Sequence, residues 1–145
     1  YITEAQALGA LVIWKYNIET LPVGYLVIGD GGTIGFIGKA RGIPPNKPSL
    51  AVMYSLAAYY LGMRYVYLEA GSGVTSHVSS SIIKEVKKYY KGTLIVGGGI
   101  RSKEDAYDVA SSGADIIVIG NLLETKSFEG ILKEIVETIR SIKSQ

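Results

Sequence analysis

Three glycine-bearing turns carry the residues of this sequence that are best suited to bind an anion. The first is Glu69-Ala70-Gly71-Ser72-Gly73, the second is Gly97-Gly98-Gly99, and the third is Gly120-Asn121. Glycine has no Cβ, so backbone N–H groups in such turns can approach a phosphate closely, and helix N-termini beyond the turns add positive partial charge. A single glycine turn usually serves only as a tight connection. Glycine turns after three successive strands instead favour a phosphate site, in which three or four charge-assisted hydrogen bonds of about 1.5 to 3 kcal/mol each hold the dianion.

Glu69 is the acidic residue best placed for chemistry. It is the carboxylate of the first turn and directly follows the apolar residues 65–68, so a strand end would hold it near the ligand. A carboxylate there could accept hydrogen bonds from ligand hydroxyl groups and take a proton from one of them. The structural alternative is a salt bridge to Arg101 or Lys39. Tyr67 lies on the same side of the strand, where its hydroxyl could face the ligand, although most of the 11 tyrosines are expected to be packing residues.

Other polar residues give weaker signals. The glycine-punctuated connection over residues 29–45 is long enough to be either an active-site lid or a surface hairpin. Arg101 could reach a phosphate or neutralise Glu104 on its own helix. His77 lies among serines and threonine, which gives little support for a role in proton transfer. No spacing of carboxylates suggests a metal site, and Asp115 is expected to cap a turn before its strand.

Strands alternate with helices along the chain. Short runs of β-branched and aromatic residues predict strands over residues 23–28, 65–68, 93–96 and 115–119. Hydrophobic periodicity predicts helices over residues 2–16, 48–61, 81–90, 103–112 and 128–142. In the first helix, one face carries Ala5, Leu8, Leu11 and Val12.

Helix ends are marked by glycines and by one capping box. Gly62, Gly92 and Gly113 are expected at left-handed C-caps, because glycine adopts that conformation without a steric penalty. Ser102 followed by Asp105 predicts a capping box at the start of the helix over residues 103–112.

The alternation predicts an α/β fold with parallel strands and right-handed crossovers. A doubly wound open sheet would give the same local pattern, but the glycine turns favour a TIM (β/α)₈ barrel whose ligand site lies at the C-terminal ends of the strands. One helix and four βα units form about the C-terminal half of such a barrel, as a single domain over residues 1–145. Because four strands leave two edges unpaired, we expect the N-terminal strands of the barrel to be absent from this chain.

Composition excludes several classes of function. The chain has 48% hydrophobic and 19% charged residues, which is typical of a globular domain. Its net charge of +2 gives no reason to expect a nucleic-acid partner. The absence of cysteine excludes disulfides and fits a cytoplasmic protein. The most apolar stretch, residues 10–14, is far shorter than the roughly 18 to 20 residues of a membrane span.

The three turns in their context resemble one known family. The segment YLEAGSG at residues 67–73, followed by LIVGGGIRS at 94–102 and ADIIVIGN at 114–121, resembles the geranylgeranylglyceryl phosphate synthase family and its bacterial heptaprenylglyceryl relatives. The resemblance extends upstream through residues 22–27 and 57–64 and covers essentially the whole chain. The second and third turns occur in many phosphate-binding barrels, whereas YLEAGSG together with both is specific.

The resemblance implies a prenyltransferase of ether-lipid synthesis. Such an enzyme transfers a geranylgeranyl group from its diphosphate to the 3-hydroxyl of sn-glycerol 1-phosphate, with Mg²⁺ holding the diphosphate. Glu69 would orient or deprotonate the attacking hydroxyl. The positions that the family uses to bind glycerol phosphate correspond to Tyr67, Leu68, Glu69, Ala70, Gly71, Ser72, Gly73, Gly98, Gly99, Gly120 and Asn121.

The family's magnesium-binding carboxylate and part of its prenyl groove lie on the first strands and helices of the barrel. We therefore expect the Mg²⁺ ligands outside this chain, and we expect no turnover from the chain alone until an N-terminal fragment is supplied. The unpaired edges predict a homo-oligomer or a complex with that fragment. Trp14 and Tyr16 are candidate interface aromatics, although packing in a core is the commoner role of such residues.

Two other functions fit part of the pattern. A sugar-phosphate isomerase or lyase on the same barrel would share the glycine turns but use different acid-base residues. A non-catalytic half barrel, acting as a structural or assembly module, would bind phosphate without transferring a prenyl group.

Overall fold

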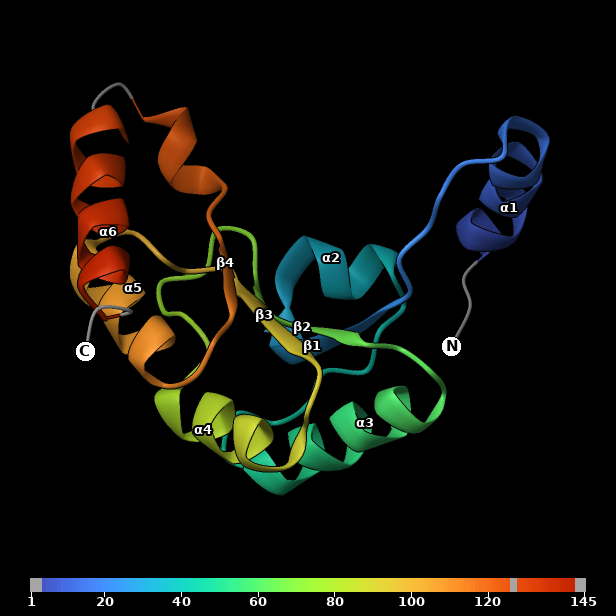
Figure 1. The fold of residues 1–145 in the computed structure, drawn as a ribbon, viewed down its shortest axis with the longest axis horizontal. Helices are drawn as coiled ribbons and strands as arrows, with labels where there is room; N and C mark the ends of the chain where they lie inside the picture. Colours follow the sequence, from blue (N-terminus) through green and yellow to red (C-terminus); the bar gives the residue numbers. More distant parts are fainter. Residues whose placement is uncertain (1–3, 126–127, 143–145) are drawn as a thin grey trace.

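A four-stranded parallel sheet lies at the centre of the molecule, in a computed structural model that describes residues 4–125 and 128–142 (Figure 1). The strands are β1 (Val23–Gly31), β2 (Tyr65–Gly71), β3 (Thr93–Gly97) and β4 (Ile116–Val118). Their order in the sheet is β1-β2-β3-β4, and each neighbouring pair is parallel. Neighbours in the sheet are thus consecutive in the sequence, as in a (β/α)₈ barrel, whereas a doubly wound sheet reverses its strand order at a switch point.

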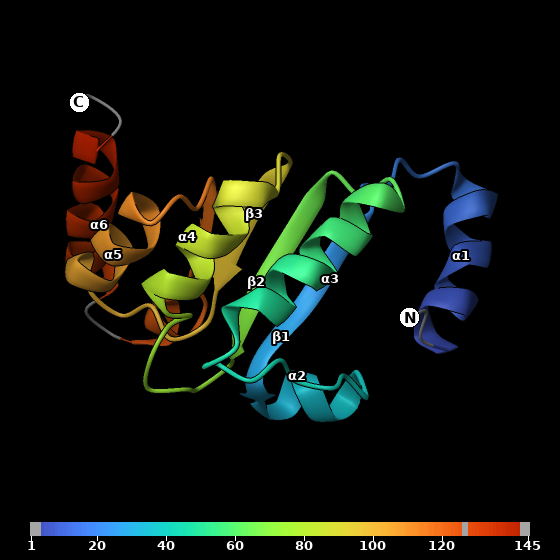
Figure 2. The same cartoon turned by 90° about the horizontal axis from the view of Figure 1, so that it is seen from below.

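Helices alternate with these strands along the chain. They are α1 (Glu4–Tyr16), α2 (Gly32–Ile37), α3 (Pro48–Tyr60), α4 (Ser80–Tyr89), α5 (Lys103–Ser111) and α6 (Phe128–Ile142), with a short 3₁₀-helix, η1 (Asn121–Glu124), after β4. Helices α3 and α4 cover the convex side of the sheet, α5 and α6 lie beyond β4, and α2 lies at the C-terminal end of β1 (Figures 1 and 2). Among the described residues, no helix has both the length and the apolar character needed to cross a membrane.

The hydrophobic core lies between the sheet and the helices. Side chains alternate between the two faces of a strand, and every second residue of β2 and β3 points toward the helices. Val66, Leu68, Leu94 and Val96 are fully buried there. They pack in one cluster with residues of α3, α4 and α5.

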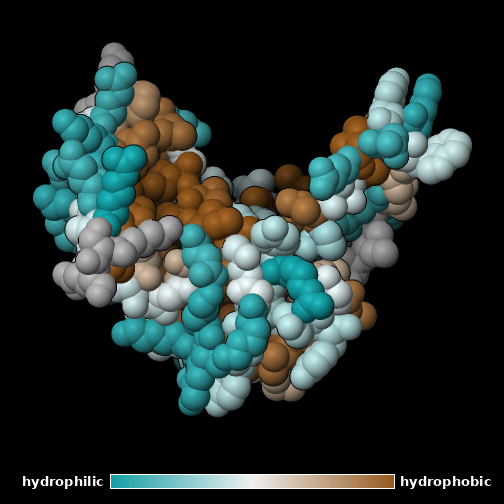
Figure 3. Space-filling model, in the orientation of Figure 1, coloured by the Kyte–Doolittle hydropathy of each residue, from teal (hydrophilic) through white to brown (hydrophobic). Residues whose placement is uncertain are grey.

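The opposite, concave face of the sheet lacks such a cover within the described residues. Tyr25, Ile116 and Val118 point to this side and remain 44%, 43% and 40% exposed. Figure 3 shows apolar side chains gathered in the hollow of the molecule. In a closed barrel this face is the packed interior. The parallel order, the one-sided helices and the open face together confirm the prediction of about half a (β/α)₈ barrel.

Helix α1 stands apart from the sheet in Figure 1 and buries none of its described side chains. Leu8, Leu11 and Trp14 are 72%, 68% and 81% exposed. The commoner role expected for Trp14, packing in a core, is therefore wrong for the described part of the chain. Residues 1–3, which include the predicted helix start at Ile2, lie outside the described residues.

The helix ends confirm most of the local predictions. Gly62 and Gly113 have the expected positive φ angles, 90° and 111°. Gly92 as a left-handed cap is wrong, because α4 ends at Tyr89, its C-cap Tyr90 is extended, and Gly92 does not have a positive φ. The site instead excludes a side chain: a Cβ on Gly92 would collide with the carbonyl oxygen of Arg64. The capping box of Ser102 is present in full.

The connection over residues 29–45 is not a hairpin. Strand β1 continues to Gly31, helix α2 follows, and the chain returns to form a parallel bridge between Ile43 and Ile28. A helix in a glycine-rich segment runs against intrinsic propensity. Close packing favours it here, because Gly35 is buried where a Cβ would meet the carbonyl oxygen of Asp30. A lid function for this segment stays a prediction.

Candidate functional site

The first and third glycine turns are joined at the C-terminal ends of β2 and β4. The side-chain oxygen of Asn121 accepts a hydrogen bond from the backbone nitrogen of Gly73 at 3.2 Å. The hydroxyl oxygen of Ser72 lies 3.4 Å from the same atom, which makes a weaker second contact. These two contacts bring turns that are about 48 residues apart in the sequence to one place.

The second turn lies against the other two. A Cβ on Gly98 would lie 2.5 Å from Oε1 of Glu69 and 2.8 Å from the carbonyl oxygen of Gly71, so the two turns are in direct contact. A cavity of about 20 Å³ separates the second turn from the third, which is room for about one water molecule. It is lined by Gly98, Gly99, Ile100, Arg101, Val118, Ile119, Gly120 and Asn121. The three predicted turns therefore converge on one small site.

Not every N–H group of the turns is available to a ligand. The Gly71 N–H donates to Oε1 of Glu69 at 2.7 Å, and the Gly73 N–H is used by the bond between the turns. An anion at this site would therefore meet fewer free amides than the number of glycines suggests.

Glu69 is a buried carboxylate held by two donors. Only 5% of the residue is exposed. Oε2 accepts a hydrogen bond from the Tyr25 hydroxyl at 2.9 Å, and Oε1 accepts the one from Gly71. These donors differ from Arg101 and Lys39, the salt-bridge partners that the sequence suggested as an alternative. The Arg101 guanidinium donates instead to the carbonyl oxygen of Val74 at 2.8 Å and so braces the first turn.

Tyr25 and Tyr67 form a stacked pair beside this carboxylate. The two residues are in register across β1 and β2, and their ring centroids are 4.8 Å apart with an angle of 20° between the planes. Burial raises the pKa of each hydroxyl well above its usual value, and the neighbouring Glu69 raises it further. Both hydroxyls therefore stay protonated at neutral pH and serve as hydrogen-bond donors.

Sequence reasoning missed Tyr25, and it did not foresee that Gly97 of the second turn makes room for Tyr67. A Cβ on Gly97 would collide with the hydroxyl of Tyr67, so the first glycine of the second turn makes room for that ring. The two-residue alternation that places Tyr67 on the concave face does the same for Tyr25 on β1. That signal was present in the sequence, but only the register of β1 against β2 identifies the pair.

Within the segment of residues 67–73, the side chains of Leu68 and Ala70 point toward the hydrophobic core and not toward the candidate site. The Leu68 side chain is fully buried in the core between sheet and helices. Ala70 is partly buried against the same core. Both point away from Glu69 along the strand, so at these two positions only the backbone faces the site.

The remaining polar candidates pack against helix α5 or the strand ends. His77 bonds through Nδ1 to the carbonyl oxygen of Val78 at 2.8 Å, and Nε2 lies 3.9 Å from carboxylate oxygens of Asp105 and Asp108. Asp115 does not cap its own turn. It accepts a hydrogen bond from the backbone nitrogen of Leu94 at 2.8 Å and pairs with Lys87.

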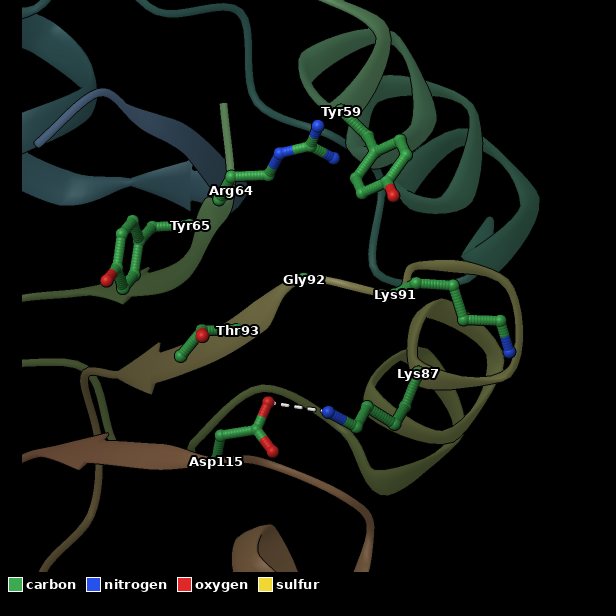
Figure 4. A pocket seen from close by; sticks show the side chains of 8 residues that line it. All are labelled: Tyr59, Arg64, Tyr65, Lys87, Lys91, Gly92, Thr93 and Asp115. Atoms are coloured by element: carbon green, nitrogen blue, oxygen red, sulfur yellow. Dashed lines mark hydrogen bonds and ion pairs between the residues drawn. The ribbon is translucent and has the colours of Figure 1, made fainter. Parts of the chain in front are cut away.

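A larger cavity of about 450 Å³ lies at the opposite, N-terminal ends of the strands (Figure 4). It is lined by Tyr59, Arg64, Tyr65, Lys87, Lys91, Gly92, Thr93 and Asp115. The Arg64 guanidinium lies 4.5 Å from the Tyr59 ring centroid, and Lys87 is neutralised by Asp115. Ligands of (β/α)₈ barrels bind at the C-terminal ends of the strands, whereas the N-terminal end serves stability. The candidate site is therefore the smaller cavity near Glu69.

Comparison with known proteins finds relatives that share one name. It is 50% identical over 143 residues to the geranylgeranylglyceryl phosphate synthase of Nitrosopumilus maritimus, covering 99% of this chain and 57% of that protein. It is 56% identical over 124 residues to the synthase of Cenarchaeum symbiosum, covering 86% of this chain and 50% of that protein. The chain thus spans little more than half the length of these curated relatives.

Solved structures agree with the sequence matches. The structure resembles, with a TM-score of 0.92 and 41% identity, the crystal structure of (S)-3-O-geranylgeranylglyceryl phosphate synthase from Thermoplasma acidophilum in complex with sn-glycerol-1-phosphate. That match covers 97% of this chain and 57% of the solved one. A second match, to the wild-type enzyme from Thermoplasma volcanium, has a TM-score of 0.87 and 40% identity and covers 94% of this chain and 56% of that one.

The profile of the PcrB family matches residues 1–139, which is nearly the full length of the chain. This match shows that the chain belongs to the PcrB family.

Proposed function

We propose that this chain forms the glycerol-phosphate-binding part of a prenyltransferase that joins a geranylgeranyl group to the 3-hydroxyl of sn-glycerol 1-phosphate. The observation that carries the proposal is the convergence of three glycine turns beside one buried carboxylate, Glu69, at the C-terminal ends of the strands. A phosphate monoester needs an amide-lined site, and a reacting hydroxyl needs an acceptor a few ångströms away.

In this proposal, the phosphate is bound by backbone N–H groups of the second and third turns and by Ser72. The small cavity between Gly99 and Asn121 forms the floor of an open site. The solved relative from Thermoplasma acidophilum binds sn-glycerol-1-phosphate, and its 41% identity over 97% of this chain supports the same ligand here. Tyr67 would contribute a protonated hydroxyl at the side of the glycerol.

Glu69 would accept the hydrogen bond of the substrate's 3-hydroxyl and take its proton as that oxygen attacks. The new bond joins this oxygen to the allylic carbon of the prenyl group, while the bond from that carbon to the diphosphate breaks and the diphosphate leaves with both electrons. Because the site holds the 3-hydroxyl beside its proton acceptor, Glu69, much of the entropic cost of bringing them together is paid before the transition state. Because Glu69 is buried and held by two donors, it needs little reorganisation during the reaction.

The family resemblance alone suggests that a magnesium ion holds the diphosphate of the prenyl donor. Among the described residues, no three acidic, histidine or cysteine side chains come together as metal ligands. We therefore assign no step to Mg²⁺ on this chain, and we place its ligands on the part of the barrel that the curated relatives carry beyond the matched region.

We further propose that this additional part covers the concave face of the sheet. The exposure of Tyr25, Ile116 and Val118 supports the proposal, because these residues lie where a barrel has its packed interior. We call the chain joined to that part the completed barrel.

Prenyl transfer by the completed barrel tests the function. With geranylgeranyl diphosphate, sn-glycerol 1-phosphate and Mg²⁺, we expect formation of the glyceryl ether. Glu69→Gln should lower kcat by about 10²-fold or more, the usual contribution of a general base, and leave the Kd for glycerol phosphate nearly unchanged in calorimetry. Glu129→Gln, at an exposed position on α6, is the matched control.

One outcome would contradict the proposed function, and another would contradict only the role of Glu69. Binding of glycerol phosphate without any prenyl transfer would favour a non-catalytic phosphate-binding module. An unchanged kcat for Glu69→Gln would remove Glu69 from the chemistry and leave the function itself in place.

A further inference from the structure

We propose that Tyr25 is a positioning residue for Glu69: its hydroxyl fixes the orientation of the carboxylate and thereby decides which acceptor positions remain for the substrate. The inference rests on the proposed function. It concerns a residue of β1 that lies 44 positions before Glu69 in the sequence.

Each carboxylate oxygen has one direct donor, and the Tyr67 hydroxyl also interacts with Glu69, so that burial and this interaction together raise the pKa of Tyr67. Tyr25 donates to Oε2 at 2.9 Å, and the Gly71 N–H donates to Oε1 at 2.7 Å. An ionised carboxylate has about four acceptor positions, so these two bonds leave at most about one on each oxygen for the substrate and Tyr67. Two donors from different strands prevent rotation of the carboxylate, because either rotation breaks at least one charge-assisted bond.

Tyr25 is itself held in place by contacts that do not depend on Glu69. Its ring stacks on Tyr67, which is its register partner on β2. Tyr67 in turn lies over Gly97, where any side chain would collide with its hydroxyl. The Tyr25 ring is therefore aligned by the sheet, and its hydroxyl reaches Glu69 from a defined direction.

Packing alone does not account for Tyr25. The residue is 44% exposed on a face whose other exposed members, Ile116 and Val118, are aliphatic. A phenylalanine would stack on Tyr67 as well, but it would leave Oε2 of a 5% exposed carboxylate without its donor. The Tyr25 hydroxyl, and not its ring alone, is therefore needed to hold the Glu69 carboxylate.

Tyr25→Phe in the completed barrel tests the inference. We expect kcat to fall about tenfold, the effect of losing one charge-assisted bond from the catalytic acceptor, with KM for glycerol phosphate changed less than about threefold. Tyr65→Phe is the matched control. It removes a hydroxyl from the same face of β2, and the described residues show no hydrogen bond from it to Glu69.

A double-mutant cycle separates positioning from a general effect on folding. Because Tyr25 acts through Glu69, Tyr25→Phe should lower kcat no further when Glu69→Gln is already present. A merely structural role would instead lower kcat by the same factor in both backgrounds and would lower the thermal midpoint. Either that additivity or an unchanged kcat for Tyr25→Phe would overturn the inference, and the proposed function would stand. Absence of transfer by the unsubstituted completed barrel would overturn both.

Discussion

The side-chain oxygen of Asn121 accepts a hydrogen bond from the backbone nitrogen of Gly73 at 3.2 Å and so joins the turns after β4 and β2. The turn after β3 lies between them and contacts Glu69 through Gly98. The spacing of the proposed phosphate site therefore depends on an amide side chain as well as on glycine backbone. Helix η1 begins at Asn121.

Asn121→Ala should weaken binding of sn-glycerol 1-phosphate to the completed barrel about tenfold, because the first turn loses its link to the third. One hydrogen bond between partly exposed groups contributes about 0.5 to 1.5 kcal/mol, so the fold should survive. Titration calorimetry measures the affinity. Asn46→Ala, in an exposed loop, is the control. Equal affinities of the two variants would show that the link does not shape the site.

Gly98→Ala should destabilise the protein by about 1 to 3 kcal/mol and abolish binding of glycerol phosphate. The residue has a φ of 83°, and a Cβ would lie 2.5 Å from Oε1 of Glu69 and 2.9 Å from the Gly71 nitrogen. Chemical denaturation gives the free energy of unfolding. Gly130→Ala on α6 should instead stabilise by about 0.5 to 1 kcal/mol, because its Cβ enters open space in a helix. Similar effects at both positions would contradict the assigned packing.

Local signals in the sequence predicted the elements and the end of the sheet that carries the site. Helix α6 has the predicted bounds, β2 and β3 begin where expected, and the glycine turns converge. These features depend on hydrophobic period and turn chemistry, which are properties of neighbouring residues.

Features that depend on contacts between distant residues could not be predicted in the same way. Gly92 was assigned to a left-handed cap, but its role is the close approach of Arg64, which lies on another βα unit. The donor of Glu69 is on β1 and becomes visible only with the strand register. Helix α2 forms against the propensity of its glycines because of packing at Gly35.

Asp115→Ala should cost about 2 kcal/mol of stability, and Lys87→Met should cost less than about 1 kcal/mol. The ion pair between them is more than a third exposed, so its own contribution is small. Asp115 also accepts the bond from the Leu94 nitrogen, and its removal leaves that partly buried donor unpaired. Thermal or chemical denaturation of both variants gives the comparison. If the two costs were equal, the ion pair and not the backbone bond would be the important contact.

Stability should fall as the pH rises above about 10, and the Tyr25 and Tyr67 hydroxyls should contribute to that fall. Burial and then Glu69 raise both pKa values in the folded chain above the ordinary value of about 10 that applies in the unfolded chain. Above that pH the unfolded chain releases protons that the folded chain retains, so the equilibrium shifts toward unfolding. Below it the contribution is complete.

A variant with Phe at both positions should show a shallower decline than the unsubstituted protein between pH 9 and about 11. Urea denaturation at each pH measures it. All other ionisable groups are common to both proteins, so their contributions cancel in the difference. Parallel declines would show that these two hydroxyls ionise as readily in the folded chain as in the unfolded one.

The 145-residue chain alone should show no prenyl transfer, and transfer should appear when the remaining part of the barrel is supplied as a separate fragment. The physical reason is the open concave face: Ile116 and Val118 are about two-fifths exposed beside the proposed site, so water reaches a region that a transfer to an apolar allylic carbon needs to exclude. Product formation is followed with radiolabelled glycerol phosphate. The Tyr60→Ser variant, altered at an exposed position on α3, is a control that should respond to the fragment as the unsubstituted chain does. Transfer by the chain without the fragment would show that the described half barrel already contains a complete active site.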